Sequence, residues 1–91
     1  MGHFTYIIQS IKDNTWYYGY STDPVVRLKF HNRGASRYTK SKVPWRLIFV
    51  REFETKSEAL NFEKYLKKTR NKEYIKKEFS EYFIRDVAQP G

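Results

Sequence analysis

The stretch FTYIIQSIKDNTWYYGY, residues 4–20, decides the fold. Its two halves, residues 4–11 and 15–20, are rich in the aromatic and β-branched residues that favour strands. Asp13 and Asn14 lie between the halves, and both residue types are common in tight turns. The stretch therefore predicts a β-hairpin at the start of the chain.

A short helix is expected directly after the hairpin. Asp23 can cap its N-terminus, Pro24 suits its first position, and Gly34 suits its end. The next segment, residues 36–42, is basic and shows no apolar period, so it predicts a loop and not a packed element.

A third strand is expected at residues 45–53. Four consecutive apolar residues, 47–50, lie within it, which is typical of a strand covered on both faces. We therefore expect this strand to occupy the middle of the sheet.

Two more helices are expected to follow. Thr55 and Glu58 match a capping box, and apolar residues then recur at helical spacing as far as Leu66. Asn71 can cap the last helix. Residues 89–91 have the composition of a frayed end.

The expected order of elements is β-β-α-β-α-α, which defines the fold class as α+β. We expect a single small domain in which helices flank a three-stranded mixed or antiparallel sheet. A chain of 91 residues has room for one such domain and one modest core. The core of this domain is expected to span about residues 3–84.

The charge of the chain indicates an anionic partner. Eighteen Lys and Arg against ten Asp and Glu give a formal net charge of +8. Aromatic residues interleave with the basic ones, and no apolar run is long enough to cross a bilayer, so nucleic acid is favoured over membrane. The chain has no Cys and begins without the pattern of a signal peptide, so a cytoplasmic location is expected.

Three polar residues are candidates for phosphodiester chemistry, which needs a metal-binding carboxylate and a cation on the phosphate. Glu63 lies near the edge of the apolar face of the second helix, although its spacing alone favours a solvated ion pair with Lys67 at i+4. Arg27 and His31 are four residues apart and could reach a single phosphate, or they could be a solvated Arg beside a partly buried His.

Two tyrosines of the hairpin are further candidates. A two-residue turn would place Tyr17 opposite Ser10 and on the same sheet face as Tyr6. In that register Tyr6 and Tyr17 would still be ~13 Å apart along the sheet. Packing is the default role of a tyrosine, and the two could share a site only if another turn or a twist closed this gap.

The chain resembles the GIY-YIG nuclease family in five elements that occur in order and at matching intervals. They are Phe4-Thr5-Tyr6, Tyr17-Tyr18-Gly19, Arg27, His31-Asn32-x-Gly34, and Ala59-x-x-x-Glu63-x-x-Leu66-Lys67. Together they cover about three quarters of the chain, and short stand-alone bacterial members are the most similar. Phe4 and Thr5 replace the glycine and isoleucine of the first family motif, and Tyr18 replaces the isoleucine of the second.

This resemblance implies a DNA endonuclease with one divalent metal, Mg²⁺ or Mn²⁺, and a role in DNA repair or processing. It assigns Glu63 to the metal, Arg27 to the phosphate and Tyr17 to general base catalysis. Tyr6 and His31 would position or assist these groups.

Sequence specificity is expected to be low, because the chain has no room for a separate DNA-recognition domain. Basic side chains can contact phosphates without reading bases. The candidates for these contacts are Arg27, Arg37, Lys40, Lys42, Lys67, Lys68 and Arg70.

Two other functions are compatible with the sequence. The chain could be a module that binds DNA or RNA without cleavage, and its binding would then survive removal of metal. It could also be a subunit of an assembly in which a protein partner supplies substrate recognition.

Overall fold

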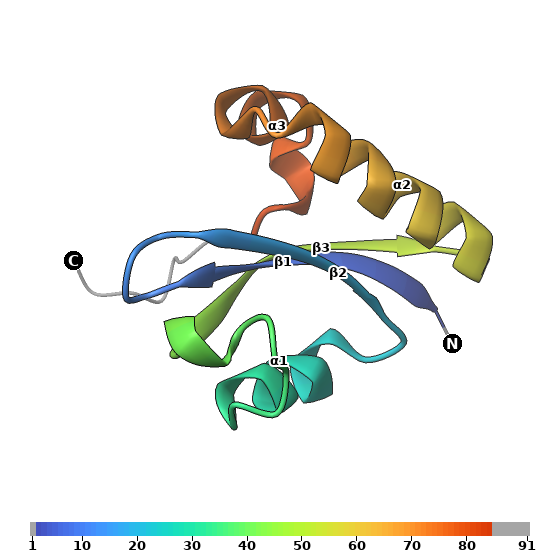
Figure 1. Cartoon of the computed structure of the whole chain (residues 1–91). Helices are drawn as coiled ribbons and strands as arrows, with labels where there is room; N and C mark the ends of the chain where they lie inside the picture. Colours follow the sequence, from blue (N-terminus) through green and yellow to red (C-terminus); the bar gives the residue numbers. More distant parts are fainter. Residues whose placement is uncertain (1, 85–91) are drawn as a thin grey trace.

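The computed structural model describes residues 2–84, which form one sheet and helices on both of its faces (Figure 1). The expected frayed end at residues 89–91 lies outside the described residues. In chain order the elements are β1 (His3–Ser10), β2 (Trp16–Ser21), α1 (Pro24–Asn32), the 3₁₀ turn η1 (Lys40–Lys42), β3 (Trp45–Phe53), α2 (Lys56–Thr69), α3 (Lys72–Glu78) and the 3₁₀ turn η2 (Ser80–Tyr82). This order confirms the α+β prediction.

The sheet is antiparallel throughout, with strand order β2-β1-β3. The middle strand is therefore β1, and the prediction that residues 45–53 lie there is wrong. The outer edge of β3 is covered instead by the chain after η2, because the Ile84 amide donates to the Ile48 carbonyl and Phe83 bridges to Phe49. The apolar run of β3 reflects burial on both faces of the sheet, because Ile48 and Phe49 pack in one core cluster and Leu47 packs in the other.

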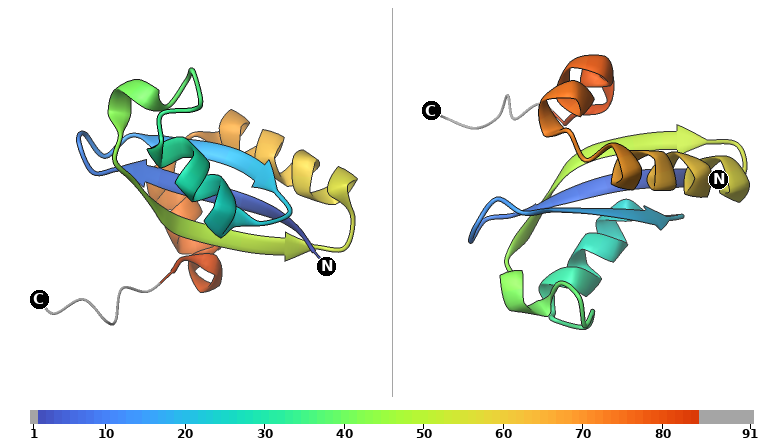
Figure 2. Two further views of the ribbon diagram at one scale, coloured as in Figure 1. Left: turned by 90° about the horizontal axis from the view of Figure 1, so that it is seen from below. Right: turned by 45° about the horizontal axis from the view of Figure 1, so that its top comes forward.

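Two layers of helices cover the sheet. The helices α2 and α3 lie on one face, and α1 with η1 lies on the other (Figures 1 and 2). The core is divided in the same way, since Ile7, Phe49 and Leu66 belong to one buried cluster whereas Tyr6 and Ile8 belong to the second. Alternation along β1 therefore sends odd-numbered residues toward α2 and even-numbered residues toward α1.

The hairpin loop differs from the expected two-residue turn. The Ser10 amide donates to the Thr15 carbonyl at 2.8 Å, so four residues form the loop, and Asn14 adopts a left-handed conformation with φ 66°. The register consequently places Tyr17 opposite Ile8 and not opposite Ser10. Because the shift is an even number of residues, Tyr17 keeps its expected face and moves closer to Tyr6.

The helix ends follow the sequence signals. Asp23 accepts a hydrogen bond from the Val26 amide, and Thr55 forms a capping box with Glu58. Asn71 caps α3 through the Tyr74 amide. Between α2 and α3, Arg70 adopts a left-handed conformation with φ 54°. None of the helices within residues 2–84 has the length and apolar character needed to cross a membrane.

Candidate active site

Tyr6 lies in the middle strand with its ring packed over Gly19. The two residues are cross-strand partners, and a Cβ atom placed on Gly19 would lie 2.4 Å from the Tyr6 hydroxyl oxygen. The Tyr6 side chain is buried, with 1% of its surface exposed. Gly19 is therefore the residue that leaves room for the Tyr6 ring, and the Tyr-Tyr-Gly sequence has a steric reason.

His31 joins the two tyrosines from α1. Its Nε2 lies 2.9 Å from the Tyr6 hydroxyl, and its ring centroid lies 5.1 Å from that of Tyr17. The spacing of Arg27 and His31 had suggested that both could reach a single phosphate. The imidazole is instead fully buried and does not reach the surface. Burial, with the Arg27 charge nearby, lowers the pKa of His31 to about 4, and the ring is neutral at pH 7.

The segment after α1 holds the other side of the imidazole. Thr39 Oγ1 lies 2.8 Å from His31 Nδ1, and the Trp45 indole donates to the Thr39 carbonyl at 2.9 Å. Asn32 accepts from the Trp45 amide and donates to the Trp45 carbonyl. The segment predicted as an unpacked basic loop thus contains a buried residue, Thr39, that fixes His31.

Arg27 faces the Tyr6 hydroxyl from the same helix. Burial raises the pKa of Tyr6 to about 12, although a hydrogen bond with Arg27 acts in the opposite direction. The Arg27 guanidinium also lies 4.2 Å from the centroid of the Phe30 ring, which orients it. Tyr6 is therefore protonated at neutral pH, and Arg27 is a fixed cation beside it.

Glu63 approaches the same group from α2. Thr5, next to Tyr6 in β1, donates to the Ala59 carbonyl at 2.6 Å and so ties α2 to the sheet one turn before Glu63. The Glu63 side chain is 14% exposed, and its charge is close enough to Tyr6 to raise the pKa of that hydroxyl further. The i+4 ion pair considered at the sequence level is present, since Lys67 Nζ lies 2.7 Å from Glu63 Oε2.

The structure thus brings together all five residues that the sequence nominated for catalysis. Tyr6 is their centre: His31 lies within hydrogen-bond distance of its hydroxyl, and the charges of Arg27, Tyr17 and Glu63 influence the pKa of that hydroxyl. Sequence reasoning missed Thr5, Thr39 and the Asn32 clamp, because a buried Thr or Asn in a short motif gives no periodic signal.

A divalent cation fits this group only through Glu63 and the substrate. No cluster of three or more His, Asp and Glu that could hold a metal occurs within residues 2–84. Mg²⁺ is commonly held by one or two carboxylates together with phosphate oxygens and water. A single, mostly buried carboxylate on a basic surface matches that chemistry, with Lys67 paired to one carboxylate oxygen.

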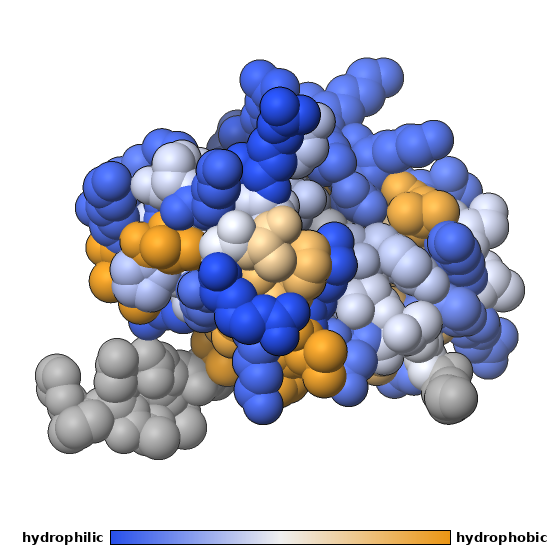
Figure 3. Space-filling view, turned by 60° about the horizontal axis from the view of Figure 1, so that its bottom comes forward, coloured by the Kyte–Doolittle hydropathy of each residue, from blue (hydrophilic) through white to orange (hydrophobic). Residues whose placement is uncertain are grey.

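The basic residues nominated for nucleic acid lie around this group in different settings. Arg37, Lys40 and Lys68 are exposed. Lys42 forms an ion pair with Asp13 of the hairpin loop, and Lys67 pairs with Glu63. Figure 3, a view onto the α1 side, shows mainly hydrophilic surface with small hydrophobic areas between.

A small basic α+β domain with a buried Tyr-His pair, a fixed arginine and one accessible carboxylate has the features of a phosphodiester-cleaving nuclease. Comparison with known families agrees with that class. The model of the GIY-YIG catalytic domain matches residues 2–78, so the chain belongs to the GIY-YIG family. This is a nuclease family whose members generally use divalent metals.

The relatives are small bacterial proteins. The chain is 47% identical over 75 residues to UPF0213 protein YazA of Bacillus subtilis, a match that covers 80% of this chain and 75% of the relative. It is 36% identical to a UPF0213 protein of Lactococcus lactis, with 90% and 93% covered. The solution NMR structure of UPF0213 protein BH0048 from Bacillus halodurans superposes with a TM-score of 0.51 at 38% identity and covers 82% of each chain.

Proposed function

We propose that the protein is a metal-dependent DNA endonuclease of low sequence specificity that acts in DNA repair or processing in the cytoplasm. The observation that carries this proposal is the convergence of Arg27, His31, Tyr17 and Glu63 on the Tyr6 hydroxyl. Exposed cations such as Arg37 and Lys68 would hold the DNA backbone without reading its sequence.

In this proposal each side chain has a separate task. Arg27 binds the scissile phosphate and stabilises the charge that develops on it. Tyr17, which packs against His31, would in its deprotonated form take the proton of the attacking water, and the oxygen that leaves the phosphorus would take a proton from solvent. Tyr6 and His31 remain neutral and hold Arg27 and Tyr17 in place through the buried hydrogen bond. Glu63 would hold the divalent cation, which when bound polarises a phosphoryl oxygen.

A plasmid assay tests this function. The protein should convert supercoiled plasmid to relaxed circles with Mg²⁺ or Mn²⁺, and Glu63→Gln and Tyr17→Phe should each abolish this conversion while DNA binding persists. Lys77→Gln, a change of an exposed cation on α3, is the matched control and should keep most of the activity. Full activity in both site variants would overturn the assignment.

A non-catalytic DNA or RNA module is the second candidate, and the Lys67–Glu63 ion pair favours it because that carboxylate already has a cationic partner. Such a module would bind equally well in EDTA, would not nick plasmid, and would bind more tightly when Glu63 is replaced by Gln. A protein partner could then supply the catalytic or recognition function, and pull-down from cell extract would detect it.

A further inference from the structure

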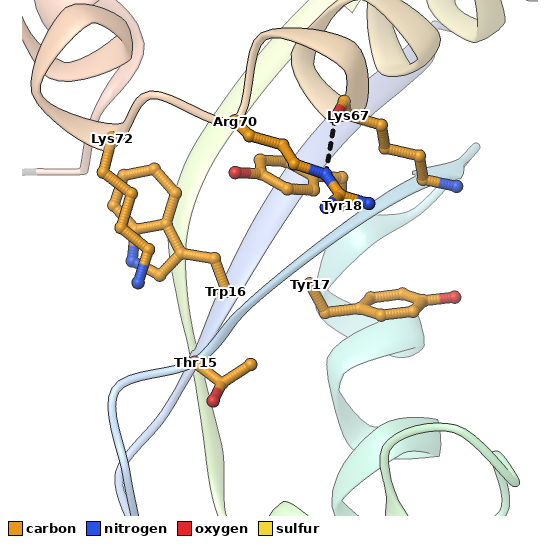
Figure 4. Close-up of a pocket in the computed structure, with 7 residues that line it drawn as sticks. All are labelled: Thr15, Trp16, Tyr17, Tyr18, Lys67, Arg70 and Lys72. Atoms are coloured by element: carbon orange, nitrogen blue, oxygen red, sulfur yellow. Dashed lines mark hydrogen bonds between the residues drawn. The ribbon is translucent and has the colours of Figure 1, made fainter.

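A groove follows β2, the edge strand that borders the candidate active site. Its volume is about 490 Å³, and it lies between β2 and the junction of α2 with α3 (Figure 4). Seven residues line it: Thr15, Trp16, Tyr17, Tyr18, Lys67, Arg70 and Lys72. Tyr17 is the residue that this groove shares with the candidate active site.

Aromatic side chains are present on both sides of the strand edge. Tyr17 points to the α1 side, whereas Trp16 and Tyr18 point to the α2 side (Figure 4). Trp16 is only 9% exposed and belongs to the buried core cluster on that side, and Tyr18 packs against the same cluster with its ring partly exposed. A chain that crosses the edge of β2 at Tyr17 would therefore meet the partly exposed ring of Tyr18 next. A partly exposed aromatic ring is a surface on which a nucleic-acid base can stack.

Two cations of the groove are held in place by contacts with its walls. Lys72 Nζ lies 5.1 Å from the Trp16 ring centroid and donates to the Asn14 carbonyl, and Arg70 Nε donates to the Lys67 carbonyl at 3.2 Å. None of the described residues that line the groove is acidic. The groove therefore combines positive charge for a phosphate with apolar surface for a base.

We infer that this groove binds one unpaired nucleotide of the substrate strand, next to the phosphate at Arg27 and Tyr17. Its volume is in the range of pockets that enclose small ligands, and its lining matches a nucleotide and not an apolar ligand. A paired base cannot leave its stack without an energetic cost. The inference deepens the proposed function and rests on it: the preferred DNA has an unpaired nucleotide beside the cut.

Binding without cleavage tests this inference. In EDTA, fluorescence anisotropy would compare a labelled DNA duplex with the same duplex that carries a short unpaired bulge. The wild-type protein should bind the bulged DNA about ten-fold more tightly, because one base gains aromatic stacking. Arg70→Gly and Lys72→Gln should each remove most of this preference.

The variants are chosen to separate groove binding from general charge and from folding. Gly tolerates the left-handed conformation that Arg70 adopts, so Arg70→Gly is expected to fold. Lys77→Gln removes an exposed charge outside the groove and should weaken binding to both DNAs by the same factor. Equal affinity of the wild-type protein for both DNAs, or an unchanged preference in both groove variants, would overturn the inference.

Tryptophan fluorescence gives an independent readout. Trp16 is 9% exposed and lines the groove, whereas Trp45 is 3% exposed and lies in the other core cluster. A short oligothymidylate should quench the emission, and Trp16→Phe should remove that response. Because these measurements need no metal, a protein that shows the preference but never nicks plasmid would contradict the nuclease function alone.

Discussion

The Tyr6 hydroxyl and His31 Nε2 lie 2.9 Å apart although 25 residues separate them in the chain. Tyr6 comes from the middle strand and His31 from the helix that follows the hairpin. Both side chains are buried, at 1% and 0% exposure. A hydrogen bond in this setting orients both rings, so changes that move either partner should reach the whole candidate site.

Replacement of Gly19 by Ala should displace Tyr6. The new Cβ would lie 2.4 Å from the Tyr6 hydroxyl oxygen, so the ring must move and break its contact with His31. We expect a loss of about 1–3 kcal/mol in the free energy of unfolding, as in other overpacked interiors, and a loss of plasmid nicking. Urea denaturation and the nicking assay measure the two effects.

Gly34→Ala is the matched control for that experiment. An added Cβ there meets only Lys40 Cβ at 3.8 Å, so no clash is expected. Because φ is +76°, the variant loses stability through backbone strain. It should lose stability and keep nicking once folded. Equal nicking by folded Gly19→Ala and wild-type protein would contradict the role given to Tyr6.

The stability of the protein should fall as pH is lowered below 6.5. Burial lowers the pKa of His31 to about 4 in the folded state, whereas the unfolded chain binds the proton near the ordinary value of 6.5. The unfolded state therefore holds more protons between these values, and up to about 3 kcal/mol of stability, present above pH 6.5, is lost on the way to pH 4.

Urea denaturation at several pH values between 7 and 4 measures this slope. His31→Gln has no titrating imidazole at this position and should show a flatter dependence over the same range. The same slope in both proteins would show that another group is responsible.

The strength of sequence signals explains which features were predicted. Caps at Asp23, Thr55 and Asn71 are local, and the structure confirms each of them. Strand order was not local: β3 resembles a central strand because helices cover both faces of the sheet, so its side chains pack in both core clusters. The distance between Tyr6 and Tyr17 depended on the hairpin loop, and its four residues could not be distinguished from two by composition.

Removal of the Lys67 charge should increase the affinity of the protein for divalent metal. Lys67 Nζ lies 2.7 Å from Glu63 Oε2, so a metal must compete with the lysine for this carboxylate. The ion pair is half exposed on the lysine side, so its loss should tighten Mn²⁺ binding only about two- to five-fold. Calorimetric titration of Mn²⁺ into the wild-type and Lys67→Met proteins, each bound to a non-cleavable DNA, measures this change. Glu63→Gln should abolish the binding, and Lys67→Met with unchanged Mn²⁺ affinity would contradict the assignment of the metal to Glu63.

The Asn32 side chain should contribute more to stability than a helix-terminating residue does. It accepts from the Trp45 amide at 2.6 Å and donates to the Trp45 carbonyl at 2.9 Å, so Asn32→Ala leaves two backbone groups of a buried residue without partners. We expect a loss of about 1–3 kcal/mol in the free energy of unfolding. Asn61→Ala, at an exposed position of α2, should be neutral or slightly stabilising because Ala is the better helix former.

Because Trp45 also holds Thr39, Asn32→Ala should shift the His31 ring resonances in NMR spectra, whereas Asn61→Ala should leave them in place. Similar stability of the two variants would show that the clamp contributes nothing.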